Sequence, residues 1–216
     1  MLKDLVEIGQ IIQNARVFNP RNWEKPSMEA NALLAAVGRL FALLEEREAA
    51  YVLVGGVALL NYVEGRNTQD IDLIMALPDL EKVPEIKVEH QDNPYFARAA
   101  FQGLQIDILL TSNPLFRRVQ QEHATQQAFL EREVSIATVE GLLLLKLYAL
   151  PSLYRQGDFV RVSIYENDIA SLLYTYQPDS QTLLAELEPY LGEGDMVSLR
   201  GIMAEIEQRI RRFRGR

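Results

Sequence analysis

The sequence contains no cysteine, which excludes disulfides, thiolate metal sites and cysteine nucleophiles. It has two histidines, His90 and His123, and their spacing to each other and to the acids does not match a metal-ligand pattern. No apolar run reaches the about 18 residues of a membrane-spanning helix, and the first residues show no signal-peptide core. We therefore expect a cytoplasmic protein with no membrane partner.

Positive charge is also scarce, because 22 Lys and Arg face 30 Asp and Glu, for a net charge of -8. Binding nucleic acid through broad phosphate neutralisation needs many basic side chains on one face, so any such contact would be local. Only nine prolines and 48% hydrophobic residues among 216 indicate an ordinary globular chain that is long enough to bury a core.

The middle of the chain reads as short apolar strands separated by turns. Residues 51–54 are β-forming and end at Gly55-Gly56, which predicts a strand, a tight turn and a helix from Val57. Residues 78–95 carry three prolines and mixed charge, so we expect a long excursion with at most weak structure. Further strands of the same sheet are predicted at 71–74, 96–101, 106–110 and 134–137, with a turn at Gln102-Gly103.

Helical periodicity dominates both ends of the sequence. Two helices are expected within residues 1–50, and Thr138 caps an apolar helix that should stop at Pro151. Three more helices are expected at about 163–176, 180–191 and 195–213. We predict an α+β fold, a small mixed β-sheet flanked by helices, with N-terminal helices at 1–50, a core at 51–137 and a helical region at 138–216.

Two acids stand at adjacent positions of one face in Asp70-Ile71-Asp72, because strand alternation sends both carboxylates the same way. Side by side they repel each other unless a cation lies between them. Mg²⁺ suits such a pair, since it takes one or two carboxylates and completes its shell with water and phosphate oxygens. Alternatively, the pair is a solvated strand end where acids cap a turn.

Asp107 is a lone acid in an otherwise apolar strand. If its strand lies beside that of the pair, it completes a two-metal arrangement or accepts a proton from an attacking hydroxyl; otherwise it is an edge-strand acid facing water. Gly55-Gly56 would let a phosphate approach backbone N–H groups at a helix start, although many such pairs are only tight turns. Arg66 precedes the acid pair by four residues, a place from which it would meet a phosphate.

Together these segments resemble the signature of the minimal nucleotidyltransferases of the polymerase β-like superfamily. The resemblance rests on Val54-Gly55-Gly56-Val57-Ala58, on Arg66-x-Thr68-x-Asp70-Ile71-Asp72-Leu73, and on Ile106-Asp107-Ile108-Leu109. The later helix at 139–150, with Asn167-Asp168-Ile169, is similar to the AbiEii abortive-infection toxin branch, a type IV toxin–antitoxin group. That branch often has Lys and Asp where Ile164 and Tyr165 stand here.

The resemblance implies roles for particular residues. The glycines would hold the triphosphate, the acid pair would bind Mg²⁺ or Mn²⁺, and the third acid would assist in catalysis and metal binding. Lys146 and Asp168 would position the nucleotide, although Lys146 could instead carry its ammonium out of an apolar helix face. The implied site comprises Asp70, Asp72 and Asp107 as catalytic and metal-binding acids, with Gly55, Gly56, Arg66, Thr68, Lys146 and Asp168 at the nucleotide.

These features predict a Mg²⁺-dependent nucleotidyltransferase that moves an NMP group from a nucleoside triphosphate to an acceptor hydroxyl. The resemblance implies a tRNA 3′ end or a protein as the acceptor, and a cognate antitoxin as a partner. The alternative is a catalytically inactive nucleotidyltransferase-fold protein that binds a nucleotide or a partner protein.

Overall fold

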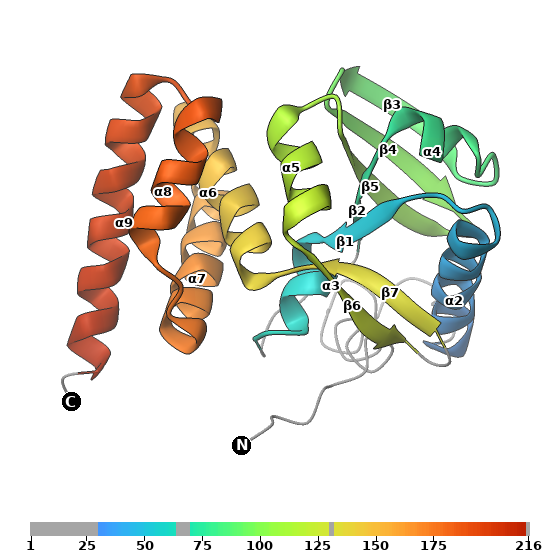
Figure 1. Ribbon diagram of the computed structural model, residues 1–216, viewed down its shortest axis with the longest axis horizontal. Coiled ribbons are helices and arrows are strands. Elements are labelled where there is room, and N and C mark those ends of the chain that lie inside the picture. The colour runs from blue at the N-terminus through green and yellow to red at the C-terminus, as the bar shows by residue number, and fades with distance from the viewer. Residues whose placement is uncertain (1–29, 64–69, 130–131, 215–216) are drawn as a thin grey trace. The chain divides into compact units, whose positions relative to one another are not determined.

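The computed structural model describes residues 30–63, 70–129 and 132–214 (Figure 1). The chain divides into two compact units, of which the first ends at Thr138 and the second begins at Val139. The first unit contains the β-sheet and the second is helical. The mixed sheet with flanking helices confirms the predicted α+β fold class.

A seven-stranded mixed sheet forms the first unit, in the order β3-β4-β5-β2-β1-β7-β6. The pairs β1–β7 and β2–β5 are parallel, and the other neighbours are antiparallel. The strands are β1 (Tyr51–Val54), β2 (Ile71–Met75), β3 (Lys87–Asn93), β4 (Phe96–Phe101), β5 (Leu104–Leu110), β6 (Ala124–Phe129) and β7 (Arg132–Ala137). The strands predicted at 51–54, 71–74, 96–101, 106–110 and 134–137 are confirmed.

Helices cover both faces of this sheet. Phe41 of α2 (Ala30–Glu46) stacks on Tyr51 of β1, with ring centroids 5.7 Å apart, and Phe116 of α5 (Pro114–Glu122) meets Phe96 of β4 edge-on at 5.3 Å. In the strand register, Tyr51 lies on the same face of the sheet as Leu110, and Phe96 lies on the same face as Leu109. Leu109 and Leu110 are successive residues of β5 and therefore point to opposite faces. The two helices therefore pack against opposite faces of the sheet.

The prediction of weak structure at 78–95 is wrong, because this stretch holds most of α4 (Leu77–Glu81) and all of β3. Pro78 lies in the first turn of α4, where a missing N–H leaves no hydrogen bond unmade. β3 is polar because it is an end strand of the sheet and pairs on one side only. α5 and β6 were not predicted; Asn113 caps α5 by accepting from the Leu115 and Phe116 amides.

The second unit consists of α6 (Val139–Gln156), α7 (Phe159–Tyr176), α8 (Ser180–Leu187), a 3₁₀ turn at Glu188–Tyr190, and α9 (Glu193–Arg214). The predicted end of the first helix at Pro151 is wrong, since α6 continues through it to Gln156. Pro151 is buried, as are Leu150 and Leu153, so packing outweighs the one backbone hydrogen bond that proline removes. No helix in the described ranges is long and apolar enough to cross a membrane.

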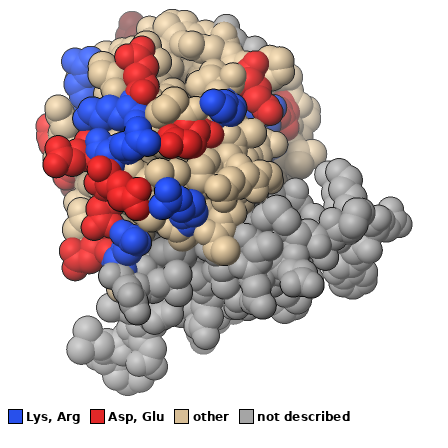
Figure 2. All heavy atoms as spheres, turned by 90° about the vertical axis from the view of Figure 1, so that its right-hand side faces the viewer, with Lys and Arg blue, Asp and Glu red and all other residues tan. Residues whose placement is uncertain are grey.

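Charges of both signs are mixed on the side of the first unit that carries α2 and α4, with no broad basic area among its described residues (Figure 2). The ion pairs of these elements are ordinary exposed ones, such as Arg39–Glu46 at 3.1 Å and Lys82–Asp79 at 2.7 Å.

Candidate active site

A row of charged side chains crosses the middle of the sheet on one face. Asp72 of β2 lies directly opposite Asp107 of β5, and Asp107 lies opposite Arg98 of β4. Residues opposite each other in neighbouring strands project from the same face of the sheet. The predicted neighbourhood of the two acids is therefore confirmed. β5 lies between β4 and β2, so the alternative of an edge-strand Asp107 is wrong.

Gly55 adjoins this row because Val54, the last residue of β1, lies opposite Asp72. Gly55 has a φ of +66° and begins α3 (Gly55–Leu60). A Cβ atom built on it would lie 2.7 Å from the Asp72 Cβ, and its carboxylate is closer still. The position therefore requires glycine twice, once for its left-handed backbone and once for its lack of a side chain. The sequence pattern predicted the turn, but not that it seats Asp72.

Asp70 precedes β2, which begins at Ile71, so its direction is not set by strand alternation as we predicted. It is half-buried, and burial is the main reason why the pKa of its carboxyl is raised above the ordinary value. The negative charge of Asp107 raises the pKa further, whereas the positive charge of Arg98 lowers it. Asp70 thus belongs electrostatically to the same cluster.

Arg98 is the residue of this cluster that sequence reasoning missed. Its Nε donates to Oδ1 of Asp107 at 3.1 Å, and the two side chains are 51% and 32% exposed. The signal was present in the sequence, because the two-residue turn Gln102-Gly103 sets the register of the β4–β5 hairpin. Both turn residues have positive φ, as such tight hairpins require, and counting back from the turn places residue 98 opposite residue 107.

The donor set suits a divalent cation that also binds phosphate. Within the described ranges, no three or more Asp, Glu or His side chains are grouped closely enough to hold a metal ion by themselves. Mg²⁺ needs less than this, since it takes one or two carboxylates and keeps water and substrate phosphates as its other ligands. Asp72 and Asp107, in register on adjacent strands with Asp70 beside them, offer those carboxylates.

Lys146 and Asp168 meet in the second unit, on α6 and α7. Their Nζ and Oδ2 atoms are 2.8 Å apart and the residues are only 5% and 8% exposed, so the alternative in which Lys146 reaches out to solvent is wrong. The ammonium also lies 4.4 Å from the ring centroid of Tyr165. The ion pair itself was not predicted, and a role of either residue in nucleotide binding stays a prediction.

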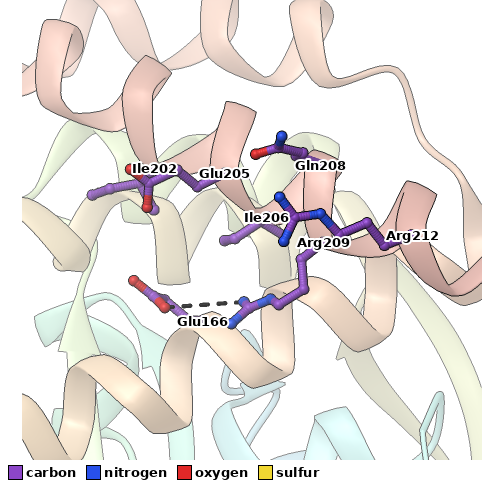
Figure 3. A pocket seen from close by; sticks show the side chains of 7 residues that line it. All are labelled: Glu166, Ile202, Glu205, Ile206, Gln208, Arg209 and Arg212. Atoms are coloured by element: carbon purple, nitrogen blue, oxygen red, sulfur yellow. Dashed lines mark ion pairs between the residues drawn. The ribbon is translucent and has the colours of Figure 1, made fainter.

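The second unit also contains a shallow pocket of about 280 Å³ between α7 and α9 (Figure 3). Glu166 of α7 faces Arg209 of α9 across it, with the nearest oxygen and nitrogen 4.0 Å apart. The other lining residues belong to α9 and are Ile202, Glu205, Ile206, Gln208 and Arg212. No residue of the predicted site lines this pocket.

Two predicted phosphate-binding residues, Arg66 and Thr68, lie outside the described residues, as does the first helix expected within 1–50. Gly56 follows Gly55 in the first turn of α3 and is buried. A hydrogen bond of 2.8 Å from the Tyr62 hydroxyl to the Ala137 carbonyl ties the end of this segment to β7. The turn that carries both glycines is thus attached to the sheet at both ends.

Comparisons with known proteins agree on the fold. No protein-family model and no curated protein matches the sequence. An antigenic nucleotidyltransferase-like protein from Paracoccidioides brasiliensis superposes with a TM-score of 0.50 at 17% identity, over 77% of this chain and 91% of that chain. ANT(2″)-Ia, solved in complex with adenylyl-2″-tobramycin, gives a TM-score of 0.52 at 12% identity, over 78% of this chain and 97% of that chain.

Identities this low relate the chain to these structures through its fold alone, and the AbiEii branch stays a prediction. The predicted fold class is nevertheless confirmed by a mixed sheet, flanking helices and a helical C-terminal part. The chain has the nucleotidyltransferase fold.

Proposed function

We propose that the protein is a Mg²⁺-dependent nucleotidyltransferase that moves an NMP group from a nucleoside triphosphate to an acceptor hydroxyl. The observation that carries the proposal is the seating of Asp72 against Gly55 and opposite Asp107. Any side chain at residue 55 would overlap the side chain of Asp72, so the glycine leaves room for the Asp72 carboxylate in this place. The nucleotidyltransferase fold of the chain, reached independently of these side chains, supports the same chemistry.

The cation-binding residues of the proposal are Asp72 and Asp107, with Asp70 at their side. When bound, Mg²⁺ would neutralise charge on the phosphates during an in-line displacement. Burial, and after it the negative charge of Asp107, raises the pKa of Asp70, and a divalent cation bound beside these carboxylates would favour the charged form of Asp70.

The proposed reaction is an in-line displacement at the α-phosphorus of the nucleoside triphosphate. The acceptor oxygen forms a bond to the α-phosphorus, the bond from that phosphorus to the bridging oxygen breaks, and pyrophosphate leaves. The hydroxyl proton passes to a carboxylate, for which we assign Asp107. The Gly55-Gly56 turn and Arg66 would hold the triphosphate, and Thr68, Lys146 and Asp168 would complete the nucleotide site as the family resemblance implies.

The acceptor remains a choice between chemical classes. The resemblance to the AbiEii branch favours a tRNA 3′ end or a protein hydroxyl, with a cognate antitoxin as partner. The structural neighbour ANT(2″)-Ia was solved with an adenylylated aminoglycoside, which adds a small-molecule hydroxyl to the acceptors worth testing. All three classes present the same nucleophile to the α-phosphorus.

Label transfer tests the proposal. The protein is incubated with Mg²⁺ and each α-³²P nucleoside triphosphate, in separate reactions with total RNA, lysate protein or tobramycin. We expect labelled acceptor in one class, lost in Asp72→Asn and kept in Asp79→Asn, whose carboxylate pairs with exposed Lys82 away from the carboxylate row. Nucleotide binding without transfer would favour the non-catalytic alternative, and no binding of metal or nucleotide would contradict both.

A further inference from the structure

Arg98 introduces a fixed positive charge into a site that is built of carboxylates. Its guanidinium binds Oδ1 of Asp107, which has Asp72 as its neighbour on the other side. This ion pair lies in the row of side chains that contains the proposed metal ligands, and Asp107 is itself one of them. A divalent cation approaching Asp107 would therefore meet a carboxylate that is already neutralised.

The side chain of Arg98 is also suited to leave that position. It is half exposed, and it donates to Asp107 through Nε. A guanidinium presents five N–H donors in a planar fork that matches phosphate as well as carboxylate. A triphosphate arriving beside Asp107 would offer this fork several charged oxygens in exchange for one.

We propose that Arg98 is the internal counter-cation of the site, which exchanges the Asp107 carboxylate for nucleotide phosphates when metal and nucleotide bind together. This inference rests on the proposed function, because it assumes that the carboxylate row holds the metal. Arg98 then acts as a positioning residue that couples the two ligands. Arg98 weakens the binding of the metal alone and strengthens the binding of the metal–nucleotide complex. Such coupling between two ligands is reciprocal.

The coupling gives a signature in which two affinities change in opposite directions. Replacing Arg98 by Gln removes the competing charge but keeps a side chain of similar length. We expect Mn²⁺ alone to bind about two- to fivefold more tightly, which is the range for loss of an exposed ion pair. We expect the Mn²⁺ complex of a non-hydrolysable nucleotide to bind about 10- to 100-fold more weakly, because charge-assisted contacts to phosphate are lost.

The measurement is the electron paramagnetic resonance signal of free Mn²⁺, titrated with and without the nucleotide analogue, so no turnover is needed. Arg47→Gln is the matched control, since Arg47 is 44% exposed and pairs with Glu85 at 3.0 Å on the same unit. It makes the same change in net charge and should alter neither affinity. Arg98→Lys should keep the weak binding of Mn²⁺ alone but bind the nucleotide complex less tightly than the native protein.

Two results would overturn the inference. If Arg98→Gln weakens both affinities, or leaves the binding of Mn²⁺ alone unchanged, Arg98 only supports the sheet. Asp72→Asn separates this failure from that of the proposed function. If Asp72→Asn no longer binds Mn²⁺, the proposed metal site is supported, whatever the result for Arg98→Gln. Mn²⁺ binding that survives in Asp72→Asn overturns the metal site and the role of Arg98 together.

Discussion

Replacing Gly55 by alanine tests whether the turn after β1 exists to seat Asp72. The new Cβ would lie 2.7 Å from the Asp72 Cβ, against the 3.4 Å at which ordinary contact begins. The added Cβ would also overlap with the Asp72 carboxylate, but this group can move away by rotation of the side chain. The Cβ of Asp72 cannot, because the backbone of β2 holds it between β1 and β5. Relief therefore requires the turn or the strand to move.

The free energy of unfolding should fall for two separable reasons. The left-handed backbone, with φ at +66°, costs a non-glycine residue about 1–2 kcal/mol. Forcing an extra carbon into a filled place costs about 1–3 kcal/mol more. Gly157→Ala is the matched control, since its φ is +68° but nothing lies within 4 Å of the added Cβ. Gly157→Ala should lose only the backbone contribution.

The assay has two parts, urea unfolding followed by circular dichroism and Mn²⁺ binding by the native protein. Gly55→Ala should be destabilised by about 1–3 kcal/mol more than Gly157→Ala, and it should bind Mn²⁺ about 10- to 100-fold more weakly because a metal ligand is displaced. Asp72→Gly should relieve the clash, so that adding Gly55→Ala to it costs only the backbone part. Equal loss of stability in the two alanine variants, with native Mn²⁺ affinity in both, would refute the reasoning.

Three further predictions concern titratable groups. Because the raised pKa of Asp70 means that the native state binds this proton more tightly, its contribution to stability is present below 3.8 and is lost as pH rises through the raised value. In EDTA, Asp70→Asn should therefore melt at a progressively higher temperature than the native protein above that pH, and a lower melting temperature at pH 7 would contradict this. Lys146→Met removes the ammonium that forms an ion pair with the buried Asp168 and should cost about 3–5 kcal/mol in urea unfolding, most of it recovered by adding Asp168→Leu; an unrecovered loss would point to packing instead. The hydrogen bond from Tyr154 to Glu166 is the main cause that raises the pKa of Tyr154 to about 12, so Glu166→Gln should shift this group toward 10.0 in an ultraviolet titration read against Tyr154→Phe.

The sequence was sufficient for the strands of the sheet that are buried. β1, β2 and β5 are short and mostly apolar runs, so their pattern and their burial agree. β3 escaped prediction because an end strand needs no apolar residues on its free side. α5 escaped because it is short and opens with a proline, and its Asn113 cap is informative only once the preceding strand is known to end.

The site could be predicted as a set of residues but not as an arrangement. That Asp72 lies opposite Asp107 depends on β2 and β5 being parallel neighbours, a pairing between segments more than thirty residues apart that local pattern does not specify. Arg98 was within reach, since a two-residue hairpin turn fixes its register with Asp107. The burial of Lys146 was not, because an apolar helix face allows both a solvated ammonium and a buried ion pair.

The central claim, that the carboxylate row binds a metal–nucleotide complex, is tested most directly by a crystal structure with Mn²⁺ and a non-hydrolysable nucleoside triphosphate. We predict an anomalous peak with Asp72 and Asp107 oxygens among its ligands, because Mn²⁺, like Mg²⁺, prefers carboxylate oxygens. The triphosphate should lie beside the Gly55-Gly56 turn. A nucleotide bound elsewhere, with no Mn²⁺ at Asp72, would contradict the account.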